Sequence, residues 1–155
     1  MYFPEGDCPF YRVTVFSHYS PNNVPDIRRY WSLMAEVSES SVKPVDARSI
    51  VEDTVRGLVA TGLIKGREQV HHTWHRRLQR GYPTPSLGRD LALQELLPAL
   101  EERNIFSRGR FGAWKYEVSN QDHSFAQGVE VVDYWLDGTG EETLHHSEIV
   151  NSRKA

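Results

Sequence analysis

The sequence predicts a mixed α/β fold (an α+β mixture), in which a short antiparallel sheet accompanies several amphipathic helices. Two segments, 12–19 and 30–38, are rich in β-branched and aromatic residues and are separated by the turn-forming run SPNNVPD. Longer segments carry apolar residues at helical spacing. A chain of 155 residues with 39% hydrophobic residues can bury a core.

The two predicted strands are close enough along the chain to form a hairpin, so we expect them to pair antiparallel. Alternation along 12–19 places Arg12 and Phe16 on one face and Val13 and Tyr19 on the other. A third strand is expected from Gln69 to Leu78.

Two helices are expected in the middle of the chain, over 46–63 and 90–102. Asp46 or Ser49 can cap the first of them. In the second helix, Pro98 should distort or shorten the helix because it lacks a backbone N–H group.

The last predicted helix begins at Asn120, a good N-cap residue, and continues to about Leu136. Its apolar side chains are expected to face inward: Phe125, Val129, Val132 and Trp135. Before it lie a Pro/Gly loop over 81–90 and a short extended segment over 106–112. We therefore expect a single region over 1–136, followed by a polar tail over 137–155 that frays and in which Glu141 and Glu142 are solvated.

Composition and charge exclude several classes of function. A net charge of −3 gives no indication of nucleic-acid binding, and no apolar run is long enough to span a membrane. The N-terminus lacks the pattern of a signal peptide, and the single Cys8 excludes an internal disulfide, so a cytoplasmic location is expected. No Cys or carboxylate follows the histidines of 71–75 at ligand spacing, so we expect surface histidines and no metal site.

The densest polar stretch runs from Ser107 to Ser124 and contains two arginines around Gly109. Arginine suits bidentate recognition of phosphate, glycine permits close backbone approach, and a helix start at Asn120 favours an anion. Spacing alone leaves open the plainer interpretation, a capped helix after a turn with solvated arginines.

Two further residues have a functional and a structural interpretation that the sequence does not separate. Arg12 lies among aromatic residues and is either a phosphate-binding cation or a surface arginine on an edge strand. Tyr82, in the rigid run GYPTP, is either presented to a ligand or packed by its own prolines.

Four blocks of the sequence resemble eukaryotic UDP-galactopyranose mutases: FPEGDCPFYR, YWSLMAEVSESSVKPV, GYPTP and, most specifically, SRGRFGAWKYEVSNQDHSF. The similarity extends from Met1 to about Leu136. It implies an isomerase of the FAD-dependent, amine-oxidase-like flavoproteins that interconverts UDP-galactopyranose and UDP-galactofuranose for cell wall biosynthesis. In that family reduced FAD acts as the nucleophile, with no net redox change.

The resemblance implies that the chain is the C-terminal part of such an enzyme. No Gly-x-Gly-x-x-Gly fingerprint follows a strand, so the N-terminal Rossmann βαβ unit is lacking. What remains corresponds to strands of the substrate-binding sheet and to helices of the FAD domain. We expect no catalytic residue in this portion and no activity of the chain alone, and we expect the missing N-terminal half or a complementing subunit as its partner.

The resemblance also assigns residues to the two ligands. For UDP-galactose, it implies that two arginines grip the pyrophosphate and that tyrosines surround the diphosphate and sugar: Arg12, Arg110, Tyr2, Tyr19, Tyr82 and Tyr116. For FAD, it implies a segment whose helix N-terminus faces the flavin: Gly109, Arg110, Ser119, Asn120, Gln121 and Ser124.

Two positions depart from the family pattern. Lys115 stands where arginine is frequent, and Ser119, which stands where glycine is frequent, could crowd the approach to the flavin. The alternatives are a fragment of another amine-oxidase-like flavoprotein and a non-enzymatic, free-standing binding module. The paired arginines argue against the former, and the missing fingerprint is the main argument for the latter.

Overall fold

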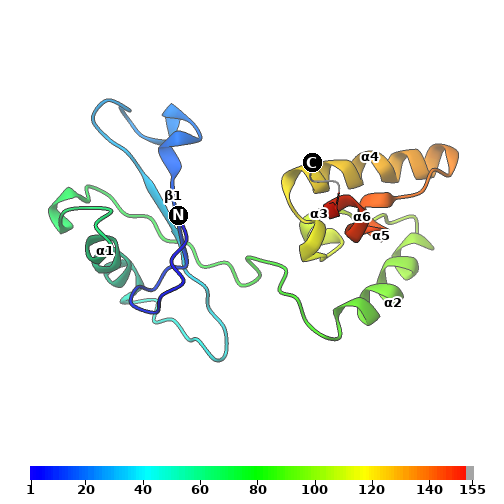
Figure 1. Cartoon of the computed structure of the whole chain (residues 1–155), viewed down its shortest axis with the longest axis horizontal. Helices are drawn as coiled ribbons and strands as arrows, with labels where there is room; N and C mark the ends of the chain where they lie inside the picture. Colours follow the sequence, from blue (N-terminus) through cyan, green and yellow to red (C-terminus); the bar gives the residue numbers. More distant parts are fainter. Residues whose placement is uncertain (153–155) are drawn as a thin grey trace. The chain divides into compact units, whose positions relative to one another are not determined.

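The computed structural model describes residues 1–152 and divides the chain into two compact units, Met1–Arg77 and Leu78–Ala155 (Figure 1). The first unit contains both strands and one α-helix, and the second contains only helices and their connections. This division differs from the sequence expectation of one region over 1–136 and a tail. Mixed α/β content, however, is as predicted.

The first unit is built on an antiparallel pair of strands, β1 (Arg12–Val15) and β2 (Leu33–Glu36). Arg12 lies opposite Glu36, and Val15 lies opposite Leu33. The predicted pairing is confirmed, but both strands are shorter than predicted. The chain leaves β1 through two 3-10 turns, η1 (Phe16–His18) and η2 (Pro21–Asn23), because local hydrogen bonds take over from the ladder there.

The third predicted strand is wrong. Residues Arg67–Gln69 form a 3-10 turn, η3, and 70–78 have no regular structure. The side chains of 71–78 are exposed, and within the described residues the sheet has two strands. A strand needs a neighbour to pair its backbone groups, and this segment has none.

Helix α1 (Ile50–Ala60) lies within the predicted range 46–63 and supplies Val55 and Leu58 to the core of the first unit. There they meet Phe10, Val13 and Ile64. The predicted side-chain cap is wrong. Ser49 occupies the N-cap position, but its hydroxyl donates to the carboxylate of Asp53 at 2.7 Å, and Asp46 instead accepts from the backbone of Arg48.

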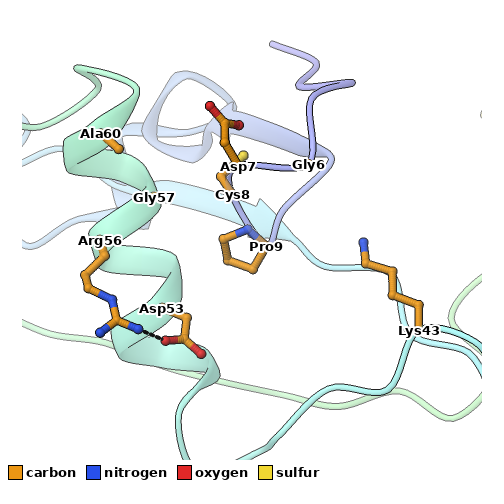
Figure 2. Close-up of a pocket in the computed structure, with 9 residues that line it drawn as sticks. All are labelled: Gly6, Asp7, Cys8, Pro9, Lys43, Asp53, Arg56, Gly57 and Ala60. Atoms are coloured by element: carbon orange, nitrogen blue, oxygen red, sulfur yellow. Dashed lines mark hydrogen bonds and ion pairs between the residues drawn. The ribbon is translucent and has the colours of Figure 1, made fainter.

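Gly57 lets α1 approach the segment that precedes β1, as Figure 2 shows beside Cys8 and Pro9. A Cβ at this position would lie 2.9 Å from Cε1 of Phe10 and 3.0 Å from Cβ of Cys8. Both atoms belong to packed side chains with little freedom to move, so glycine is required here for packing.

We therefore expect Gly57→Ala to destabilise the first unit by up to about 2 kcal/mol. Overpacking costs about 1–3 kcal/mol, and the better helix propensity of alanine returns about 1 kcal/mol. The matched control is Gly128→Ala, also inside a helix, where the new Cβ meets nothing within 4 Å and stability should rise by roughly 0.5–1 kcal/mol. Urea unfolding of both variants measures the contrast, and equal effects would contradict it.

The second unit consists of helices around a small core of Leu93, Leu97, Ala113 and Leu144. Its elements, in chain order, are α2 (Arg89–Glu101), α3 (Gly109–Gly112), the 3-10 turn η4 (Tyr116–Val118), α4 (Gln121–Asp137), α5 (Glu142–His145) and α6 (Ser147–Ser152). None of the helices among residues 1–152 is both long and apolar enough to cross a membrane.

Three predictions for this unit need correction. Pro98 does not noticeably shorten α2, because it lies in the last turn of a helix that continues to Glu101, one residue before the predicted end. The segment 106–112 is not extended throughout, since 109–112 form α3. The expected fraying tail forms α5 and α6, and its Leu144 is 1% exposed in the core.

Helix α4 begins directly after Asn120, as predicted, but its orientation is the reverse of the prediction. The residues expected to face inward are exposed: Phe125, Val129, Val132 and Trp135. The buried side chain is instead Gln127. Periodicity correctly located an apolar face but could not show whether the rest of this chain covers it.

Candidate anion-binding site in the second unit

Three of the residues predicted to bind substrate meet in the second unit. The guanidinium carbon of Arg110 lies 4.8 Å from the centre of the Tyr82 ring. The centres of the Tyr82 and Tyr116 rings are 5.6 Å apart. We call these three residues the Arg110 cluster. It brings together residues that are up to 34 positions apart in the chain, and both tyrosines are partly exposed to solvent.

The guanidinium of Arg110 makes one hydrogen bond, through Nε, and its two terminal nitrogens face no carboxylate among the described residues. Its Nε donates to the carbonyl oxygen of Ser119 at 2.8 Å, which fixes the direction of the side chain. Within residues 1–152, no carboxylate forms an ion pair with Arg110. A guanidinium held on an aromatic face, whose terminal nitrogens have no partner among the described residues, is suited to an external anion such as a phosphate.

The start of α3, which carries Arg110, is held in place by Gln127, a fully buried residue of α4. Its side-chain oxygen accepts from the backbone N–H of Gly109 at 2.8 Å, and its nitrogen donates to the carbonyl of Val118 at 2.8 Å. Gly109 has a φ of 81°, a region that favours glycine. Sequence analysis missed Gln127, since a glutamine in a helix carries no signal of burial.

Arg108, the other arginine beside Gly109, has a different role. Its side chain is 5% exposed and makes a two-bond contact with the Glu141 carboxylate, at 2.5 and 2.6 Å, and a third bond to Glu101 at 2.7 Å. Desolvation lowers the pKa of Arg108, but the hydrogen bonds to these carboxylates outweigh it and raise the pKa overall. Arg108 is therefore a structural residue, and the expected solvation of Glu141 is wrong.

A second ion pair positions Tyr116 beside the Tyr82 loop. Arg89, at the start of α2, makes two hydrogen bonds to Glu117, at 3.0 and 2.7 Å. The bond from Arg89 is the main reason why the pKa of Glu117 is lowered. Because Glu117 follows Tyr116 directly, this pair joins η4 to the end of the 81–88 loop.

The remaining cofactor-binding candidates lie at the start of α4. Asn120 and Gln121 are exposed, and Ser124 faces the loop at Gly109, where a Cβ would lie 3.6 Å from that of Ser124. The side chain of Asn120 makes no capping hydrogen bond, so the predicted cap is at the right position but without its bond. The first backbone N–H groups of a helix have no partner inside it. This end of α4 therefore favours an anionic group.

The two departures from the family pattern are both structural. The Nζ of Lys115 donates to the carbonyl of Leu144 at 2.8 Å and so ties α5 to the loop before η4. Ser119 is buried, and its hydroxyl donates to the carbonyl of Tyr116 at 3.0 Å.

Arg12 belongs to the first unit and already has a carboxylate partner. Its Nε and Nη2 donate to the two oxygens of Glu36, at 2.7 and 2.6 Å, and Nη1 donates to the hydroxyl of Tyr2 at 3.4 Å. The hydrogen bond to Tyr2, together with Glu36, raises the pKa of Arg12 above its ordinary value against the effect of desolvation. An anion at Arg12 would have to share the guanidinium with Glu36, a residue that sequence analysis did not single out.

The other candidates of the first unit lie apart from this pair or show no sign of reactivity. The ring of Tyr19 contacts Phe16 and is largely exposed. Desolvation, followed by the nearby Asp7, raises the pKa of the Cys8 thiol, which fits a structural cysteine. His71, His72 and His75 are exposed, as expected. The convergence of Arg12 and Arg110 on one anion stays a prediction.

The comparisons with known proteins agree with the sequence resemblance. A crystal structure of reduced UDP-galactopyranose mutase matches the chain with a TM-score of 0.86 and 50% sequence identity. The match covers 97% of this chain and 32% of that one, so the chain spans about a third of the length of the structure it matches. A search of protein-family profiles finds no match.

Proposed function

Because the chain belongs to the UDP-galactopyranose mutase family and corresponds to about a third of such a protein, we propose that it forms part of an enzyme that interconverts UDP-galactopyranose and UDP-galactofuranose. The proposed substrate is UDP-galactose in either ring form, and the proposed cofactor is reduced FAD. The proposed partner is the remaining portion of the mutase fold. The observation that carries this proposal is the Arg110 cluster, in which a cation with no carboxylate partner among residues 1–152 lies on the ring of Tyr82, which in turn contacts the ring of Tyr116.

In this proposal the Arg110 cluster holds the diphosphate of UDP. The terminal nitrogens of Arg110 donate to phosphate oxygens, while its Nε stays bonded to Ser119 and keeps the fork in position. The hydroxyl groups of Tyr82 and Tyr116 supply further donors. Negative charge accumulates on UDP when the bond to the sugar breaks, so these donors stabilise the departing group as well as binding it.

The start of α4 is the proposed contact with the cofactor. Reduced FAD, when bound, supplies the nucleophile that reacts at the anomeric carbon. The chain contributes Gly109, Ser119, Asn120, Gln121 and Ser124 around the open helix end, whose partial positive charge favours an anionic flavin. Gln127 holds the two sides of this segment together through Gly109 and Val118.

A turnover assay tests the proposal. We expect the chain alone, with dithionite-reduced FAD, to convert no UDP-galactofuranose, because it has no dinucleotide-binding fingerprint. A single polypeptide that joins the chain to the complementary two thirds of the matched mutase should bind flavin, seen by its absorbance, and convert the substrate. A joined protein that binds flavin but neither binds UDP nor turns over UDP-galactofuranose would contradict the proposal and favour another amine-oxidase-like flavoprotein.

A further inference from the structure

Helix α4 packs on its own unit through its polar side. Besides the two hydrogen bonds of Gln127, the carboxylate of Glu130 accepts from the backbone N–H and the hydroxyl of Thr143, at 2.9 and 2.7 Å. The ring of Tyr134 lies 6.5 Å from that of Phe106. Positions 127, 130 and 134 share one face of a helix, so this face is the one that joins α4 to the second unit.

The opposite face of α4 is apolar and exposed. We call it the α4 stripe; it consists of Phe125, Val129, Val132, Trp135 and Leu136. Positions 125, 129, 132 and 136 follow helical spacing, and exposure ranges from 47% at Val129 to 75% at Phe125. A surface helix ordinarily buries its apolar side and exposes its polar side, and α4 does the reverse.

A shallow, open groove runs along this stripe. It is lined by Phe125, Val129 and Val132, together with Ser124, Gly128 and Asp133. At Gly128 an added Cβ would meet nothing within 4 Å, so the floor of the groove is open. Small residues between large apolar ones allow another segment to pack closely against the helix. The α4 stripe therefore has the shape expected of a surface that packs against another protein segment.

The solvent-accessible surface area of the chain is larger than expected for two compact domains, as it would be if a packing partner were absent. The described protein exposes 11717 Å². Two separate compact domains of half its mass would together expose about 9,600 Å². The excess, on the order of 2,000 Å², is more than the roughly 800 Å² that one partner buries in a standard interface, although the exposed segment 71–78 of the first unit contributes to it.

We propose that the α4 stripe is the docking surface for the remaining portion of the mutase fold. This inference rests on the proposed function for the identity of the partner. The matched mutase continues for about two thirds of its length beyond the part that this chain resembles, at 50% identity over 97% of the chain. A lipid surface is disfavoured, because α4 carries Asp122, Glu130, Asp133 and Asp137 and no Lys or Arg.

The test measures binding between two separate polypeptides, the chain and the complementary two thirds of the matched mutase, by sedimentation and titration calorimetry. Val132→Asp places a charge in the stripe, and Val129→Asp does so one turn away. Val42→Asp is the matched control, since Val42 is 92% exposed in the first unit. Circular dichroism checks that each variant keeps its fold, and hydrogen exchange of α4 in the wild-type complex provides an independent measurement.

We expect the wild-type chain and Val42→Asp to bind alike, both stripe variants to bind at least tenfold more weakly, and the amides of α4 to exchange more slowly in the complex. Unchanged binding by folded Val132→Asp, no binding by the wild-type chain, or self-association that Val132→Asp abolishes would each overturn the proposal, the last in favour of a second copy. A complex that forms through the stripe but has no turnover refutes the proposed function and leaves the docking surface standing.

Discussion

Replacing Arg110 by glutamine, in the chain joined to the complementary portion of the mutase, should weaken UDP binding by about 2–4 kcal/mol, or roughly 30- to 1,000-fold. The loss is large because Arg110 is the one cation of the cluster and its guanidinium is held ready, on Tyr82 and by Ser119, without a carboxylate to neutralise it among the described residues. Glutamine keeps a polar side chain but removes the charge and the fork.

Titration calorimetry with UDP measures this effect, and Arg48→Gln is the control. Arg48 is almost fully exposed and should change binding by less than about 1 kcal/mol. If Arg12 grips the same diphosphate, the loss in Arg12→Gln combined with Arg110→Gln should differ from the sum of the single losses by more than about 0.5 kcal/mol, because residues that share a partner are coupled. Wild-type affinity in Arg110→Gln would contradict the role of the cluster.

Replacing Glu141 by alanine should destabilise the second unit by about 3 kcal/mol, the upper end for charged hydrogen bonds, because it removes the two-bond partner of a buried arginine and leaves only Glu101 to balance its charge. The side chains of Arg108 and Glu141 are 5% and 4% exposed, so water cannot replace the lost partner easily. Typical domains are stable by about 5–15 kcal/mol, and the unit would therefore lose a large share of its stability.

Urea unfolding followed by hydrogen exchange in α5 measures this loss. The control, Glu102→Ala, removes an exposed carboxylate at the end of α2 and should cost less than about 0.5 kcal/mol. The double variant Arg108→Met with Glu141→Leu should recover much of the stability, because apolar residues of similar volume need no counter-charge. A loss at Glu141 no larger than at Glu102 would show that the ion pair is solvated.

The elements of the fold could be predicted where the signal was local. The hairpin of β1 and β2, the helices α1 and α2 and the start of α4 at Asn120 follow from β-branched content, apolar spacing and turn residues, and all are confirmed. The false strand over 69–78 had the right composition but no neighbouring strand. The helices α5 and α6 are short and polar, and they form because Leu144 and Glu141 find partners elsewhere in the second unit.

For the candidate site, the sequence by itself determined which residues are chemically suited to a diphosphate, and the resemblance selected Arg110, Tyr82 and Tyr116 from among them. Only the tertiary structure brought these three together and distinguished the two arginines beside Gly109, of which Arg108 pairs with carboxylates and Arg110, within residues 1–152, does not. It also identified Gln127 as the residue that holds the start of α3 and Glu36 as the partner of Arg12, and it showed that the α4 stripe is exposed. The physical reason is that residue type and spacing fix which face or which charge a segment offers, whereas the partner of a charge or of an apolar face comes from distant parts of the chain or from another protein.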